Sequence, residues 1–240
     1  MWLMRPPGVY AAQEDTALLT ESLGRERLRP GCQVLDLCAG SGAVAVAAAR
    51  WGASVTAVDV SRRALATTWV NGVLQGRRIS VRRGDLLQPV RTRRFDVVVC
   101  NPPYVPGISE SLPVRGISRA WDAGPTGRAL LDRICEQVPS VLTPGGVLLL
   151  VHSSICGVDQ TCAALSASGL KTGVVARVRQ PFGPVMRARA AAQRAGPVAM
   201  NGLSDGAANT SSRSSAARSR TLSATRTPTR GGPPPAENTP

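Results

Sequence analysis

The chain has 240 residues, of which 43% are hydrophobic and only 3% aromatic, and its formal net charge at pH 7 is +14. This length suits one domain with a full core and a tail rather than two compact domains. The longest apolar stretch, at 146–151, is far below the roughly 20 residues that span a bilayer, and the first residues lack a secretory signal. We therefore expect a soluble cytoplasmic protein with no membrane contact.

Apolar segments alternate along the chain between short continuous runs and longer stretches with helical spacing. Such alternation predicts an α/β fold with an open, mostly parallel sheet covered by helices on both faces. The expected elements, in chain order, are helix 14–23, strand 33–38, helix 43–51, strand 54–60, helix 61–74, strand 79–85, strand 95–100, helix 126–142, strand 146–154, helix 157–169 and strand 173–179. Ser61 is the expected N-cap of the third helix.

The composition changes near residue 190 to Ser, Thr, Ala, Arg, Gly and Pro without apolar periodicity. We therefore expect residues 1–190 to form the folded domain and residues 191–240 to be a disordered tail. A chain truncated near residue 190 should then melt within a few degrees of the full chain.

Cysteine and histidine residues give little sign of a metal site or a disulfide framework. The six cysteines form no CxxC pair, and His152, which follows an apolar run, is the only histidine. We expect His152 to be a residue of the strand end rather than a base, and we expect no metal.

Arginine dominates the basic residues, since Lys171 is the only lysine among 29 Lys and Arg. Two interpretations stay open for the one notable concentration of arginines, a solvated basic edge and a contact surface for RNA or the ribosome. This concentration comprises Arg77, Arg78, Arg82, Arg83, Arg91, Arg93 and Arg94.

The turn after the first strand contains Gly40 and Gly42 in a loose dinucleotide-binding pattern, and Asp59 follows about 20 residues on. A nicotinamide enzyme must therefore be considered. Against it stands Asp36, a carboxylate inside the first apolar strand, which would repel a pyrophosphate. The same charge suits the cationic amino and sulfonium groups of S-adenosylmethionine.

Three carboxylates end three successive strands, on the edge where open parallel sheets bind ligands. Asp59 could accept hydrogen bonds from both ribose hydroxyls of the cofactor, and Asp85, after the third strand, one from the adenine amino group. Each also has a structural interpretation, because Asp36 could cap the following helix, Asp59 could simply precede a helix N-cap, and Gly84-Asp85 could be an ordinary turn.

The fourth strand ends in CNPPYVP at 100–106, where two prolines alone would be ordinary punctuation. The side-chain oxygen of Asn101 and the carbonyl of Pro102 could hold both N–H bonds of a planar nitrogen, so that its lone pair points at a methyl donor. Pro102 and Pro103 would keep the turn rigid, and the Tyr104 ring could lie over the planar acceptor.

These residues together resemble a Rossmann-like class I S-adenosylmethionine-dependent methyltransferase, more narrowly the HemK-type family, which methylates the glutamine of a GGQ motif in translation release factors. The resemblance covers roughly residues 8–190 and is carried by VYAAQEDTALL, VLDLCAGSGAVAVAAAR, VTAVDVS, GDLL, FDVVVCNPPYVP and AWDAGPTGRALLDR. It implies a release factor as the protein substrate and S-adenosylmethionine as the cofactor. The implied cofactor contacts are Thr16, Asp36, Gly40, Gly42, Asp59, Asp85, Leu86 and Asn101, and the implied catalytic residues are Asn101, Pro102, Pro103 and Tyr104.

Three departures separate the chain from the longer members of that family. Only about 30 residues precede the first strand, so the chain resembles the short branch without an N-terminal helical domain. Cys38 replaces the first glycine of the cofactor loop, which suggests a tighter pocket. The family inserts a seventh strand beside the fifth, and no apolar segment near the C-terminus is a clear candidate for it.

Competing functions remain open from the sequence. Protein glutamine N5-methylation is the leading hypothesis, and its alternative is methylation of an adenine or guanine amino group in RNA or DNA, which the NPPY sequence would serve equally well. A non-catalytic binding module is a third interpretation. Trp121 and Asp122 could line the substrate entrance.

Overall fold

The computed structural model describes residues 2–181, apart from residues 11, 108, 110 and 115, together with a strand at 219–228. The helices are α1 (Glu14–Gly24), α2 (Ala43–Arg50), α3 (Arg62–Leu74), α4 (Ala129–Gln137) and α5 (Val158–Ala167). The strands are β1 (Gln33–Leu37), β2 (Ser54–Asp59), β3 (Ile79–Arg83), β4 (Phe95–Cys100), β5 (Leu142–Ser153), β6 (Gly173–Pro181) and β7 (Ser219–Pro228).

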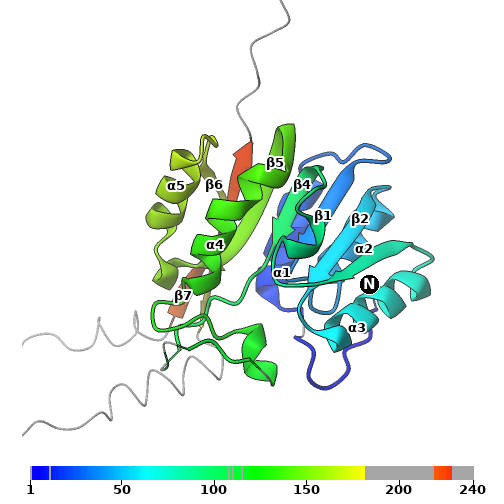
Figure 1. The fold of residues 1–240 in the computed structure, drawn as a ribbon, viewed down its shortest axis with the longest axis horizontal. Coiled ribbons are helices and arrows are strands. Elements are labelled where there is room, and N and C mark those ends of the chain that lie inside the picture. Colours follow the sequence, from blue (N-terminus) through cyan, green and yellow to red (C-terminus); the bar gives the residue numbers. More distant parts are fainter. Residues whose placement is uncertain are drawn as a thin grey trace, which may run out of the picture.

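The sheet has the strand order β3-β2-β1-β4-β5-β7-β6. Strands β1 to β5 pair in parallel, and β7 is antiparallel to both of its neighbours. Helices α1, α2 and α3 pack in a row, α4 and α5 pack against each other, and these two layers enclose the sheet (Figure 1). The predicted sheet with helices on both faces is confirmed.

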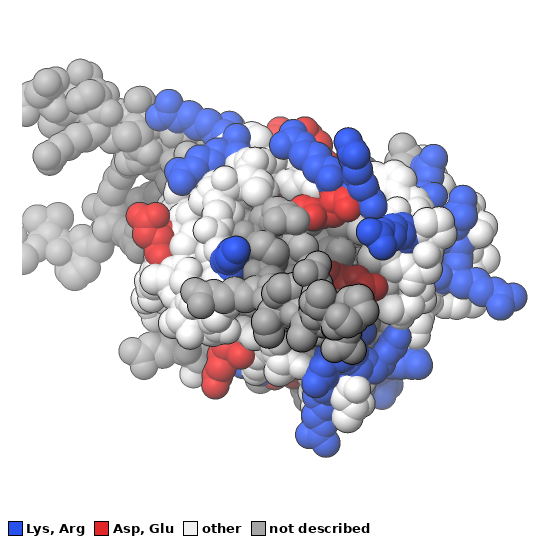
Figure 2. Space-filling view, turned by 90° about the horizontal axis from the view of Figure 1, so that it is seen from above, with Lys and Arg blue, Asp and Glu red and all other residues white. Residues whose placement is uncertain are grey.

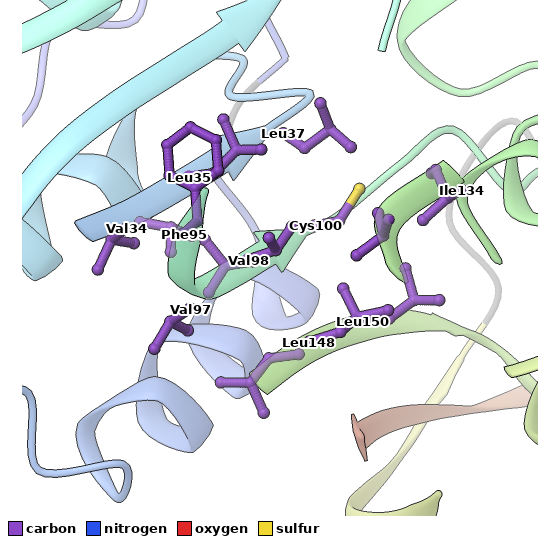
Figure 3. Packing of buried hydrophobic residues seen from close by; sticks show 14 of the residues in the cluster. Val34, Leu35, Leu37, Phe95, Val97, Val98, Cys100, Ile134, Leu148 and Leu150 are labelled. Carbon is purple, nitrogen blue, oxygen red and sulfur yellow. The ribbon is translucent and has the colours of Figure 1, made fainter. Parts of the chain in front are cut away.

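The core fills both faces of the central strands. Side chains of β1, β4 and β5 pack with Ile134 of α4 in one continuous cluster (Figure 3). Leu35, Val98 and Leu148 are completely buried. Burial on both faces explains why these strands read as continuous apolar runs rather than as alternating patterns.

Two local features also follow from the sequence. The Ser61 Oγ atom accepts a hydrogen bond from the Ala64 N–H at 3.2 Å, which confirms the expected N-cap of α3. The helix predicted at 126–142 is shorter in the structure, since α4 ends at Gln137 and a short 3₁₀ turn with Pro139 follows. Proline lacks the N–H that a continuing helix needs.

Strand β7 differs from what the sequence led us to expect, because it fills the place beside the fifth strand. Ser219–Pro228 lies between β5 and β6 and pairs with residues 147–153 on one side and with Gly173–Pro181 on the other. Its sequence, SRTLSATRTP, holds a single large apolar residue, so apolar periodicity could not reveal it. Backbone hydrogen bonding does not depend on side-chain type, and the main-chain groups of β5 and β6 need partners. The other residues of the expected tail lie outside the described part of the chain.

No helix within the described residues is both long and apolar enough to cross a membrane.

Removing β7 should destabilise the protein, in contrast to the small effect that the sequence suggested. A chain ending after residue 181 leaves β5 and β6 without the strand between them. Its melting temperature should fall by roughly 10 °C or more, since each kcal/mol shifts melting by about 2–4 °C in a domain of this size. A chain ending after residue 228 keeps β7 and should melt like the full chain. Equal melting of all three chains in a thermal scan would contradict the placement of β7.

Candidate active site

A cavity of about 650 Å³ opens at the carboxyl ends of β1 to β4. It lies where the strand order reverses between β1 and β4, the usual ligand position in an open α/β sheet. The lining combines strand ends, an N-terminal stretch that includes Gly8 and Tyr10, and residues between β4 and α4 from Leu112 to Asp122. Its volume is in the range of small-molecule and cofactor sites.

Asp36 of β1 lines this cavity although its side chain is buried. The Asp36 Oδ2 atom accepts a hydrogen bond from the N–H of Ala45 in the first turn of α2, at 3.0 Å. Burial raises the pKa of Asp36 to about 7, the Ala45 hydrogen bond opposes the rise, and the nearby charge of Asp59 adds to it. The residue therefore caps α2, as one interpretation of the sequence allowed, and also presents a readily protonated carboxyl to the cavity.

Asp59 at the end of β2 holds the turn after β1. Its Oδ2 atom accepts from the Gly40 N–H at 3.0 Å, and its Oδ1 atom accepts from the Ser61 N–H at 2.8 Å. Burial raises the pKa of Asp59, while these hydrogen bonds and the charge of Arg119 oppose the rise. Asp59 and Arg119 both lie in the lining of the cavity.

The turn itself uses left-handed backbone conformations. The φ angles are +56° at Gly40 and +78° at Gly42. A Cβ atom on Gly42 would meet the side chain of Thr68 at 2.7 Å, so α3 leaves no room for a larger residue unless Thr68 moves. Cys38 has φ +62° without being a glycine, and this residue also lines the cavity.

Asp85 and Leu86, after β3, form another part of the lining. The Asp85 Oδ2 atom lies 2.6 Å from Arg133 Nη2 in an ion pair that is substantially exposed. Exposed pairs of this kind contribute little to stability and can exchange partners. Leu86 is buried and has φ +47°, which turns the chain sharply at the cavity wall.

The NPPY turn contributes only part of itself to the cavity. Asn101 and Pro103 line it, whereas Pro102 and Tyr104 are buried outside the lining. The Asn101 Nδ2 atom donates to the Thr16 Oγ1 atom at 3.4 Å. Tyr104 is thus placed behind the cavity wall rather than across its opening.

Asp15, which the sequence analysis did not single out, connects these parts. The chain has two tyrosines, and both donate to its Oδ2 atom, Tyr10 at 2.8 Å and Tyr104 at 2.9 Å. The Thr16 N–H donates to its Oδ1 atom at 2.7 Å. This buried carboxylate therefore ties the N-terminal stretch, the start of α1 and the NPPY turn together. The only signal in the sequence was the position of Asp15 beside the expected cofactor contact Thr16, in the stretch VYAAQEDTALL.

Two further expectations concern residues after the NPPY turn. His152 is buried inside β5 with its Nδ1 atom 3.0 Å from the Ser153 carbonyl oxygen, and burial lowers its pKa. It lies outside the cavity lining. Asp122 lines the cavity, whereas Trp121 is not part of the lining. The Trp121 backbone carbonyl instead accepts a hydrogen bond from the Val105 N–H at 2.7 Å.

The fold and the cavity define a class of protein. A parallel sheet whose strand order reverses beside the cavity, acidic residues at three strand ends and an Asn-Pro-Pro-Tyr turn after the fourth strand are the features of class I methyltransferases.

Comparison with known proteins narrows this class. The profile of the methyltransferase small domain matches residues 1–116. A Methanocaldococcus jannaschii protein, provisionally named a protein N5-glutamine methyltransferase, is 33% identical over 181 residues, which cover 75% of this chain and 90% of that protein. The chain belongs to this HemK-type family of glutamine methyltransferases.

Other similar proteins are longer or more distant. The release factor glutamine methyltransferase of Gloeobacter violaceus is 33% identical over 185 residues, but the match spans only 64% of that protein. Among solved structures, the E. cuniculi Mtq2–Trm112 complex, described as responsible for methylation of the eRF1 termination factor, matches with a TM-score of 0.59 at 23% identity. That match covers 92% of this chain and 99% of the other chain, and it shows a shared fold.

The turn after β1 offers a matched pair of glycine variants. Gly42 and Gly31 have nearly equal φ angles, +78° and +81°, but a Cβ atom on Gly31 would meet nothing within 4 Å. Gly31→Ala should lower the free energy of unfolding by about 1–2 kcal/mol, which is the cost of the left-handed conformation for alanine. Gly42→Ala should lose a further 1–3 kcal/mol or so, because Thr68 must also move. Denaturant unfolding measures both values, and equal losses would contradict the close approach of α3.

Proposed function

We propose that this methyltransferase transfers a methyl group from S-adenosylmethionine to the side-chain amide nitrogen of a glutamine in a translation release factor. The observation that carries the proposal is that Asn101 and the buried carboxyl of Asp36 line the same cavity. The Asn101 side chain can accept from a planar N–H donor, and the Asp36 carboxyl suits a cationic cofactor. The names of the similar proteins from Methanocaldococcus and Gloeobacter support the choice of glutamine.

The residues of the cavity fit S-adenosylmethionine. A buried carboxyl with a pKa near 7 gains a favourable partner when a cation enters, whereas a pyrophosphate would oppose its ionisation further. Bound there, S-adenosylmethionine supplies a methyl group attached to a positively charged sulfur. Asp36 would hold the amino acid part, and Asp59 would accept from the ribose hydroxyls.

The remaining proposed contacts surround these two. Each carboxylate oxygen has two lone pairs, so Asp59 can keep its backbone hydrogen bonds while it accepts others. Asp85 would accept from the adenine amino group once it exchanges the exposed Arg133 for that donor. Leu86 would pack on the base and Thr16 would approach from α1. Gly40 and Gly42 let the backbone of the turn come close to the ligand.

Asn101 and Pro102 would orient the glutamine. Because the Asn101 Nδ2 atom faces Thr16, its Oδ1 atom is the acceptor presented to a substrate N–H. The Pro102 carbonyl would accept the second N–H, and Pro103 keeps the turn in place. Two such acceptors stabilise the positive charge that develops on the nitrogen, which then loses its proton to water. In this arrangement Tyr104 positions the turn through Asp15 and does not stack on the substrate.

A labelling experiment tests the substrate directly. The full chain is incubated with radiolabelled S-adenosylmethionine and either a release factor, the same factor with its GGQ motif changed to GGA, or total RNA. Label in the factor but not in the GGA factor supports glutamine methylation. Label in RNA alone would refute it and favour the alternative, methylation of a base amino group.

Substitution of Asn101 tests its role in the reaction. Asn101→Ala should lower the rate of methyl transfer by about 10²–10³-fold, because it removes a positioned acceptor. Its melting temperature should change little, and cofactor affinity should fall only modestly. Gln88→Ala, which removes an exposed amide away from the cavity, is the control and should keep full activity. Unchanged turnover of Asn101→Ala would refute the role of its side chain.

A further inference from the structure

Strand β3 is the outer edge of the sheet, with β2 as its only neighbour among the described strands. Arginines gather on this strand and on the loops at its ends. Six of them are exposed, namely Arg77, Arg78, Arg82, Arg83, Arg91 and Arg94. We refer to these six residues as the β3 arginine edge. Figure 2 shows Lys and Arg side chains projecting along the right-hand side of the molecule, the side on which β2 and α3 lie in Figure 1.

The charges of the β3 arginine edge are not neutralised within the described residues. The ion pairs within the described part of the chain join Arg25 to Glu21, Arg128 to Asp132 and Arg133 to Asp85. None of them involves the edge.

The hydrogen bonds that the structure gives to these arginines run only to backbone carbonyls. Arg82 donates to the Val81 oxygen at 3.3 Å, and Arg94 donates to the Arg93 oxygen at 3.2 Å. The edge therefore keeps its positive charge for an external partner.

Arg93, the seventh arginine of the cluster in the sequence, has a different use. Its Nη1 atom donates to the Thr56 Oγ1 atom at 2.9 Å, and its guanidinium lies 5.2 Å from the centre of the Phe95 ring. It thus links β2 to β4, and its side chain is only partly exposed. This contrast shows that the arginines here are not equivalent, since one is built into the fold and six face outward.

Exposed apolar side chains adjoin one end of the edge. The Gln75 Nε2 atom donates to the backbone oxygen of Trp2 at 3.2 Å. This bond fixes Trp2 beside the end of α3, because Gln75 directly follows that helix and precedes Arg77 by two residues. The Trp2 side chain is 71% exposed, and Val73 and Leu74 of the same helix end are about half exposed. An exposed indole on a surface that also carries arginines suits single-stranded nucleic acids, because a base can stack on the ring while phosphates lie on the cations.

We propose that the β3 arginine edge, together with Trp2, binds single-stranded RNA through its phosphate backbone. A line of cations along a strand edge matches a line of phosphates better than it matches a compact anion. At the carboxyl end of β3, Arg83 reaches the lining of the cavity, so RNA on the edge would lie close to the site of methyl transfer. This binding does not require the proposed glutamine substrate to be correct.

Matched charge variants test the proposal with the full chain and a fluorescein-labelled oligouridine. The edge variant Arg78→Gln, Arg82→Gln, Arg94→Gln leaves Arg83 and the cavity intact. The control variant Lys171→Gln, Arg177→Gln, Arg179→Gln removes three exposed charges in or next to β6, at the opposite end of the sheet. Anisotropy titrations over a range of salt concentrations give the affinity and its salt dependence for each protein.

The edge variant should bind the RNA at least about tenfold more weakly. Its plot of log affinity against log salt should become less steep by about 2, because each lost phosphate contact on a single strand reduces the magnitude of the negative slope by about 0.7. The control variant should bind within about threefold of the wild type, as expected for charges that contact no phosphate. Trp2→Ala should also weaken binding. Equal losses in the two triple variants, no loss in the edge variant, or equally effective competition by polyglutamate would overturn the proposal. Failure to label a release factor, with RNA binding intact, would count against the proposed substrate alone.

Discussion

A carboxyl group buried in the middle of a parallel sheet is the constraint around which this site is built. Burial of a charge is unfavourable unless partners are supplied, and Asp36 has the Ala45 N–H as its hydrogen-bond donor in the structure. That bond fixes where α2 begins, and the start of α2 in turn fixes the turn that precedes it. This one hydrogen bond does not fully offset the cost of burying the charge, so the pKa of Asp36 stays raised. A cationic ligand would stabilise the ionised carboxylate and lower that pKa.

The sheet register explains why the other site residues meet at this point. Leu37 of β1 is paired with Val58 on one side and with Cys100 on the other. The next residues, Cys38, Asp59 and Asn101, therefore leave the three strands at the same level. The Asp15 carboxylate adds α1 to this frame, because both tyrosines of the chain donate to it. Strand order and a single buried acceptor thus position residues that are far apart in the sequence.

Some of these features could be predicted from the sequence and others could not. Asp36, Asp59 and Asn101 could be predicted as one site because parallel strands share a carboxyl edge, which pattern alone reveals. The burial of Tyr104 could not, since it depends on where α1 places the Asp15 carboxylate that accepts its hydroxyl. Strand β7 escaped for another reason, because its pairing relies on backbone groups and its Ser- and Thr-rich sequence carries no apolar pattern. Arg93 could not be separated from its neighbours without the positions of Thr56 and Phe95.

The coupling between Asp36 and the proposed cofactor can be measured as proton release. If a cation pairs with Asp36, binding lowers the pKa of this carboxyl from about 7, so below that pH the protein must release a proton when the cofactor binds. Calorimetric titration of S-adenosylmethionine in buffers of different ionisation enthalpy should show, at about pH 6, close to one more proton released by the wild type than by Asp36→Asn. Affinity of the wild type should rise with pH and level off above about 7, while Asp36→Asn binds more weakly without that rise. Identical proton release and identical affinity for the two proteins would contradict the role of Asp36.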